Sequence, residues 1–249
     1  MDGDQRRLLA TMPLHAITST YGEAGLRDRF TVEIASWPEA DRRRMEQARD
    51  LAARLHADDR RDQEPYVNHL LRVAIRVMSH YRVRDADVVC AALLHDAVED
   101  HATDLAGAGA GQAAALAVLA AEFGPRVAGL VGWVTIPPPA PGQDKAAAKE
   151  AYLRGLRRAP RDAILVKLAD RASNVQTLRN LPPARQRAYY AQTVEHIVPL
   201  AGTEPWFRYW YASWRAEFSD LATAGPGGPG GSAGSPGAPA GSAGAAGAF

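Results

Sequence analysis

Apolar residues recur along the middle of the chain with the spacing of α-helices, and this pattern constrains the fold more than any other feature. One such stripe consists of Val67, Leu70, Leu71, Ala74, Val77 and Met78. Residues three and four positions apart share one face of a helix, so this stripe indicates an amphipathic helix. Alternating runs of β-branched residues, which would indicate strands, are scarce. The sequence therefore predicts an all-α fold.

Caps, prolines and glycines divide this pattern into separate helices. Ser36 and Glu39 form a possible capping box, and Asp85 is a possible N-cap. Helices are expected at residues 36–57, 66–81, 85–96, 111–123, 125–134, 144–158 and 161–180, with two more after Pro182-Pro183. We expect a single helical-bundle domain over residues 36–222, after an N-terminal extension over 1–35. Residues 223–249 are rich in Gly, Pro, Ala and Ser, which predicts a disordered tail.

The bulk composition excludes several classes of protein. The 249 residues carry a formal net charge of +1, which gives no reason to expect a nucleic acid or a membrane as partner. Apolar stretches are too short to cross a bilayer, and no signal peptide follows the N-terminus, so a cytoplasmic location is expected. The one cysteine, Cys90, lies in an apolar run and is interpreted as a buried, inert thiol.

The segment from Leu93 to Asp100 carries the strongest chemical signal. His95, Asp96, Glu99 and Asp100 fall within six positions at the end of an apolar helix. Burying such groups without partners would cost several kcal/mol, so a helix that served only the core would not need them. Imidazole and carboxylate groups are suitable ligands for Mn, Fe or Zn, and a nearby pair of carboxylates can act as general acid and base.

Two further segments supply polar side chains inside otherwise apolar helices. His69 alone would be interpreted as a core histidine, and Asp170 alone as a capping or ion-paired carboxylate. Together with the His95-Asp96 pair, they complete a set of four N and O ligands that suits a divalent ion. Asn174 lies one turn after Asp170 on the same helical face.

Four segments, taken in order, resemble one branch of the HD phosphohydrolase superfamily. They are RRDQEPYVNH at 60–69, ALLHDAVED at 92–100, EFGPRV at 122–127 and VKLADRASN at 166–174. These strings are similar to the hydrolase half of RelA/SpoT enzymes and to the free-standing small alarmone hydrolases. The resemblance covers roughly residues 45 to 220 and agrees in order, spacing and flanking residues.

The resemblance implies an HD-type helical bundle that removes the 3′-pyrophosphate of the guanine nucleotide (p)ppGpp, giving GDP or GTP. It implies one Mn²⁺, with Fe²⁺ or Zn²⁺ as alternatives, held by His69, His95, Asp96 and Asp170. Glu99 and Asp100 would activate the hydrolytic water and assist the leaving group. The implied substrate-binding residues are Arg60, Arg61, Lys149, Asn174, Arg185 and Tyr189.

Several alternatives stay open at the level of the sequence. Leu70 follows His69 where the family usually has proline, and Ser173 stands where a histidine is usual, so the substrate could be another nucleotide, such as a nucleoside phosphate or NADPH. The domain could also be a degenerate nucleotide-binding regulatory module, although Glu99 and Asp100 favour an enzyme. Arg60 and Arg61 could lie in a solvated loop. The sequence makes no prediction of the oligomeric state.

Overall fold

The structure is a computed structural model that describes residues 3–61 and 64–223. This part of the chain is helical with one short hairpin, which confirms the predicted all-α class. The N-terminal half contains α1 (Gly3–Thr11), α2 (Leu14–Tyr21), α3 (Gly25–Ile34), α4 (Glu39–Leu55), β1 (Arg60–Arg61), β2 (Glu64–Pro65), α5 (Val67–Ser79), α6 (Ala86–Leu93), α7 (Ala97–Asp100), α8 (Ala102–Ala106) and α9 (Gln112–Phe123). The C-terminal half contains α10 (Pro125–Val134), α11 (Lys145–Gly155), η1 (Leu156–Arg158), α12 (Arg161–Gln176), η2 (Leu178–Asn180), α13 (Pro183–Gln192), η3 (Thr193–Ile197), η4 (Val198–Thr203), α14 (Pro205–Glu217) and α15 (Asp220–Thr223).

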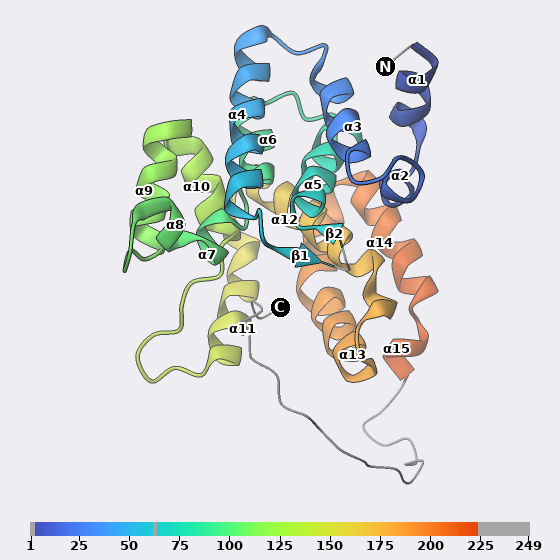
Figure 1. Cartoon of the computed structure of the whole chain (residues 1–249). Helices are drawn as coiled ribbons and strands as arrows, with labels where there is room; N and C mark the ends of the chain where they lie inside the picture. The colour runs from blue at the N-terminus through green and yellow to red at the C-terminus, as the bar shows by residue number, and fades with distance from the viewer. Residues whose placement is uncertain (1–2, 62–63, 224–249) are drawn as a thin grey trace, which may run out of the picture.

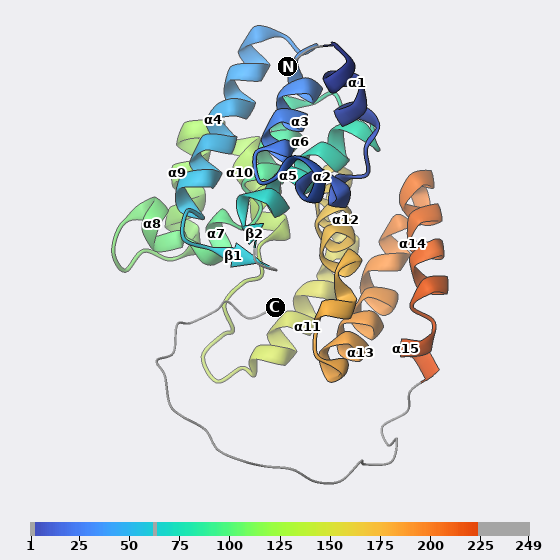
Figure 2. The same ribbon diagram turned by 45° about the vertical axis from the view of Figure 1, so that its right-hand side comes forward.

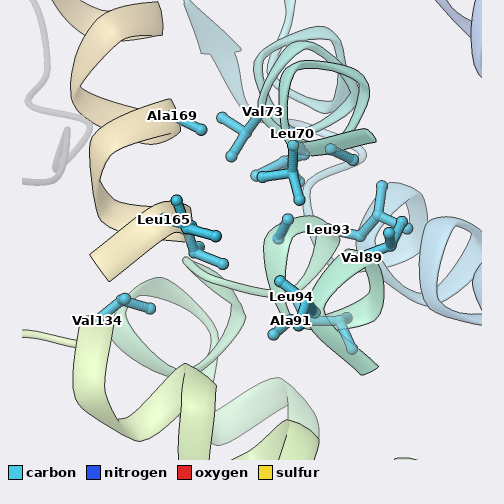
Figure 3. Packing of buried hydrophobic residues seen from close by; sticks show 14 of the residues in the cluster. Leu70, Val73, Val89, Ala91, Leu93, Leu94, Val134, Leu165 and Ala169 are labelled. Atoms are coloured by element: carbon cyan, nitrogen blue, oxygen red, sulfur yellow. The ribbon is translucent and has the colours of Figure 1, made fainter. Parts of the chain in front are cut away.

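Helices α5, α6 and α12 form the centre of the bundle and contact one another. In two views, α9 and α10 lie on one side of this centre and α13, α14 and α15 on the other (Figure 1, Figure 2). Figure 3 shows Leu70 of α5, Leu93 of α6 and Leu165 of α12 packed together, and all three are fully buried. Burying each such side chain contributes about 1.5–3 kcal/mol, so this packing fixes the three helices that carry the polar site.

Local signals in the sequence account for where several helices begin. Asp85 caps α6, because its side chain accepts a hydrogen bond from the backbone N–H of Asp87 at 3.0 Å, as predicted. Asp144 caps α11 in the same way. Gly124 separates α9 from α10 with a φ of 93°, a conformation that glycine adopts without strain, and Pro125 then begins α10.

Two predictions of local structure were wrong. The capping box does not form: α4 begins at Glu39 after Pro38, without a side-chain cap, and Ser36 instead accepts a hydrogen bond from Arg84 at 3.4 Å. The helix expected to reach residue 96 ends at Leu93. The short helices α7 and α8 then follow, and β1 pairs with β2 in antiparallel orientation. The sequence did not predict these elements, because segments of two to five residues are too short to show a periodicity.

The first 35 residues are more than a loosely attached segment. Helix α3 packs on α5, and the core includes Ile17, Leu26 and Phe30, each completely buried. The domain boundary at residue 36 stays a prediction. The predicted tail lies outside the described residues from residue 224 on.

Two smaller expectations can be compared with the structure. Cys90 is buried, as predicted, and burial raises the pKa of its thiol to about 12, so the reactive thiolate is scarce at neutral pH. Among the described residues, none of the helices combines the length and the apolar character that crossing a membrane requires.

Candidate metal centre and its pocket

The four side chains predicted to hold a metal come from three parts of the chain and meet at one point. His69 lies in α5, Asp170 lies in α12, and His95 and Asp96 follow the end of α6. Nε2 of His95 lies 2.9 Å from Oδ2 of Asp96 and 3.6 Å from Oδ1 of Asp170. Nε2 of His69 lies 3.7 Å and 3.4 Å from the same two oxygens. Donor atoms bound to one ion at about 2.1 Å stand roughly 3–3.5 Å apart. The donor atoms of His69, His95 and Asp96 all lie within 4.8 Å of one another, and Asp170 joins this group through its distances to the two histidines.

The imidazole rings of His95 and His69 are each oriented by a contact of their Nδ1 atom. Nδ1 of His95 donates to the main-chain oxygen of Ala92 at 2.9 Å, and Nδ1 of His69 lies 3.1 Å from Oγ of Ser173. When Nδ1 carries the proton, Nε2 presents a lone pair to the carboxylates, and neither Nε2 makes a hydrogen bond. A buried lone pair that faces a carboxylate oxygen is repelled unless a proton or a metal ion lies between them. The residues therefore fit a divalent metal ion.

The pKa values of the two histidines are shifted in opposite directions. Burial lowers the pKa of His95, but Asp96 and Asp170 outweigh this effect and raise it to about 10. Burial lowers the pKa of His69 to about 4, so this ring is neutral at neutral pH. In the metal-free protein a proton on His95 thus balances part of the carboxylate charge, and a metal ion that binds here would displace that proton.

Three neighbouring side chains hold the two carboxylates in place. The hydroxyl of Tyr66 donates to Oδ2 of Asp96 at 2.7 Å, and Nδ2 of Asn174 donates to Oδ1 of Asp170 at 2.7 Å. Nζ of Lys167 lies 3.0 Å from Oδ2 of Asp170. The sequence analysis did not single out Tyr66 or Lys167. A lysine three positions before an aspartate in an apolar helix is a signal that could have identified the pair of Lys167 and Asp170.

A pocket of about 530 Å³ opens above the cluster, within the range of small-molecule sites. Glu99 and Asp100 line it. Oε2 of Glu99 accepts a hydrogen bond from the backbone N–H of Ile136 at 2.9 Å, while burial raises the pKa of this carboxyl. Burial and the charge of Asp96 raise the pKa of Asp100 to about 7, which is suited to proton transfer at neutral pH.

The six predicted substrate-binding residues divide into two groups. Those that line the pocket are Arg60, Lys149, Asn174 and Tyr189. Arg61, from the same strand as Arg60, instead lines a smaller cavity beside His69, and Arg185 is exposed on α13 outside the pocket. The basic pair interpreted as a possible loop is strand β1 of the hairpin, which directs only Arg60 into the pocket wall.

The pocket contains more carboxylates than cationic side chains among the described residues. The acidic members are Asp58, Asp59, Asp96, Glu99, Asp100 and Asp170, and the Lys and Arg members are Arg60, Lys149, Lys167 and Arg171. Arg171 was not predicted. Its guanidinium lies 4.3 Å from the ring centre of Tyr189 and is held by Gln192 and Thr193. A pocket with this charge would bind a polyanion poorly unless metal ions supplied positive charge.

The fold and the site together define an all-helical protein whose buried His and Asp cluster opens into a charged pocket, as expected of a metal-dependent hydrolase. The profile of the HD domain family matches residues 48–206. The chain belongs to the HD domain family, and the match includes every residue of the cluster.

Proteins similar to this chain carry related names. It is 35% identical over 170 residues to a guanosine-3′,5′-bis(diphosphate) 3′-pyrophosphohydrolase, MESH1, of Homo sapiens, covering 63% of this chain and 84% of the relative. It is 33% identical over 197 residues to a probable GTP pyrophosphokinase of Mycobacterium leprae (strain TN) and 32% identical over 168 residues to the bifunctional (p)ppGpp synthase/hydrolase SpoT of Escherichia coli (strain K12). These alignments cover 76% and 66% of this chain but only 22% of each relative.

A solved structure is also similar. It is described as a metazoan ortholog of SpoT that hydrolyzes ppGpp, and it matches with a TM-score of 0.60 at 26% sequence identity. The match covers 74% of this chain and 98% of that chain. The likeness in fold therefore extends over almost the whole of the smaller protein.

Proposed function

We propose that this protein hydrolyses the 3′-pyrophosphate of (p)ppGpp and uses Mn²⁺, giving GDP or GTP and pyrophosphate. The observation that carries this proposal is the buried convergence of His69, His95, Asp96 and Asp170, of which the two aspartates line the pocket. The names of the similar proteins support the choice of substrate. The mixed N and O donor set suits Mn²⁺, and it would also accept Fe²⁺ or Zn²⁺. A cytoplasmic location stays a prediction.

The proposed chemistry divides between the ion and the carboxyl groups of the pocket. A divalent ion held by the four residues would supply a Lewis acid that neutralises phosphate charge and makes water a better nucleophile. Asp100, with its pKa of about 7, can accept a proton from the attacking water and return one to the leaving 3′-oxygen. The water oxygen forms a bond to phosphorus while the bond from phosphorus to the 3′-oxygen breaks. Glu99, fixed by the N–H of Ile136, is placed to orient the water.

The cationic wall of the pocket suits the remaining phosphates and the base. Lys149, Lys167 and Arg171 line one pocket with the carboxylates and can stabilise negative charge in the transition state. Arg60 and Tyr189 offer planar faces on which a purine can stack. Asn174 donates one N–H to Asp170, and its Oδ1, which is buried without a hydrogen-bond partner, can accept from a ribose hydroxyl.

The test is a substrate panel with untagged protein stripped of metal by a chelator. The panel contains ppGpp, pppGpp, a deoxynucleoside triphosphate and NADPH, each with and without added Mn²⁺. We expect pyrophosphate and GDP from ppGpp in equal amounts, only when Mn²⁺ is present. Hydrolysis of another member of the panel, with ppGpp left intact, would overturn the proposed substrate.

Two variants and a control test the assigned chemistry. Glu99→Gln and Asp100→Asn keep the shape of each side chain and remove its capacity as a base, so turnover should fall about 10²–10⁴-fold. Metal binding should remain, because neither residue belongs to the four predicted ligands. Glu217→Gln changes an exposed carboxylate on α14 and should leave turnover at the wild-type value. Turnover of the first two variants at that value would remove them from the mechanism.

A further inference from the structure

A second group of histidine and aspartate side chains lies at the rim of the pocket, separate from the four residues at its floor. Nδ1 of His56 and Nε2 of His101 lie 2.7 Å and 2.8 Å from the same oxygen, Oδ2 of Asp59. Both are hydrogen-bond distances, so a metal ion that took the place of the shared protons would separate these atoms to about 3 Å. The two nitrogens are 3.2 Å apart. Three donor atoms from the end of α4, the following loop and the start of α8 therefore converge on one point.

The orientation of His101 resembles that of a histidine held for metal binding. Its Nδ1 lies 2.8 Å from Oδ2 of Asp104, which can accept only if Nδ1 carries a proton. A carboxylate that binds one imidazole nitrogen in this way turns the other nitrogen toward a metal. Nε2 of His101 is the atom that faces Asp59 and His56.

The second histidine is fixed from two sides. The side chain of His56 is fully buried, stacks on Tyr66 with ring centres 4.8 Å apart, and meets the ring of His101 edge-on at 4.4 Å. Two imidazole nitrogens 3.2 Å apart repel each other unless a proton or a metal ion lies between them. Packing of this kind prevents the rings from turning away from one another.

The cluster is closed on one side and open on the other. The side chain of Asp59 is 40% exposed and that of His101 is 14% exposed, and both line the pocket. Three protein ligands, two histidines and one carboxylate, with further positions left open, are the arrangement found in several zinc enzymes. The open side faces the space in which the substrate would lie.

We propose that His56, Asp59 and His101 bind a second divalent ion of the zinc class at the rim of the pocket. The remaining positions of this ion would be filled by water, or by a phosphate oxygen of a bound nucleotide. The charges of the pocket favour this assignment, because its described lining residues contain six carboxylates against four Lys or Arg side chains. Each divalent ion bound in this pocket adds two positive charges and so favours a polyanion.

The experiment counts bound zinc in untagged, chelator-treated full-length protein, at a free zinc concentration in the micromolar range and without nucleotide. The wild type should bind two equivalents. His101→Ala and Asp170→Asn should each bind one, and the double variant none. His15→Ala, which removes an exposed histidine outside both clusters, should still bind two.

The stoichiometry separates this proposal from the proposed reaction. If His101→Ala binds as many equivalents as the wild type, the second site does not exist, whichever nucleotide the protein hydrolyses. Circular dichroism checks that each variant is folded. Should His101→Ala unfold, Asp59→Asn decides, because its side chain is partly exposed and the amide keeps its shape: one equivalent supports the site and two equivalents overturn it.

Discussion

The hydroxyl of Tyr66 offers a direct test of how the cluster at the floor of the pocket is held. This hydroxyl donates to Oδ2 of Asp96 at 2.7 Å, and the same oxygen lies 2.9 Å from Nε2 of His95. Tyr66→Phe removes the donor and leaves the ring in place against His56. The carboxylate then loses its anchor while the four predicted ligands stay unchanged.

The size of the effect follows from the character of this hydrogen bond. A hydrogen bond to a charged group contributes about 1.5–3 kcal/mol. The Asp96 side chain is 19% exposed, so water can replace part of what is lost and the lower end of this range applies. We therefore expect a loss of about 1.5 kcal/mol, which raises the Kd for Mn²⁺ about tenfold.

The assay is a calorimetric titration of chelator-treated protein with Mn²⁺. Tyr152→Phe is the matched control, because Tyr152 lines the same pocket but donates to the main-chain oxygen of Val134 at 2.6 Å. The control should lose some thermal stability and keep its affinity for Mn²⁺. An unchanged Kd in Tyr66→Phe would refute the reasoning, and so would an equal loss of affinity in both variants.

Three further perturbations have definite expected outcomes. In metal-free protein, the pKa of Asp100 is about 7 against an ordinary 3.8, so the folded state holds the extra proton and the free energy of unfolding falls as pH rises across that window. In Asp100→Asn, the free energy of unfolding should fall with pH by about 1 kcal/mol less than in the wild type, a figure reduced for solvent screening. Urea titrations at several pH values measure this, and an unchanged pH profile would contradict the prediction. Arg76→Ala should destabilise the fold by about 3 kcal/mol in urea, because the buried guanidinium donates to Gln176 and to a main-chain oxygen of α12; a loss under 1 kcal/mol would contradict this. Ser173→Ala removes the Nδ1 partner of His69 and should raise the Kd for Mn²⁺ about tenfold with little change in melting temperature; equal affinity would argue against that role.

The sequence predicts the floor of the pocket well because each of its polar residues interrupts an apolar pattern. His69 and Asp170 occupy buried positions on core helices, where a polar group without a partner would destabilise the fold. Their presence there is therefore best explained by a partner that they share. Of the helices that bring them together, α5 is recognised from the spacing of its apolar stripe, and α12 is an apolar helix buried along most of its length. The convergence of side chains far apart in the chain therefore follows from local patterns.

The rim of the pocket has no comparable signal. Asp59 lies in the loop after α4, and His101 lies between two helices of four and five residues. The direction of such short segments depends on the tertiary structure, so a histidine and an aspartate 42 positions apart give no hint that they meet at 2.8 Å. Arg185 is the opposite example. The family resemblance implied that it binds substrate, but it is exposed on α13 and lies outside the pocket.

The packing of the first 35 residues was also beyond the sequence pattern. Helices α2 and α3 approach so closely at Gly25 that a Cβ there would lie 2.8 Å from side-chain atoms of Ile17 and Tyr21. Only glycine permits this contact, but a lone glycine in a short segment is read more readily as a break in structure than as a close approach of two helices.

The central claim is that His69, His95, Asp96 and Asp170 hold one divalent ion. Crystals grown with Mn²⁺ and measured at the manganese absorption edge test it most directly. The claim predicts an anomalous peak within about 2.3 Å of a donor atom from each of the four residues. No peak at this position, in crystals of protein that hydrolyses its substrate with Mn²⁺, would contradict it.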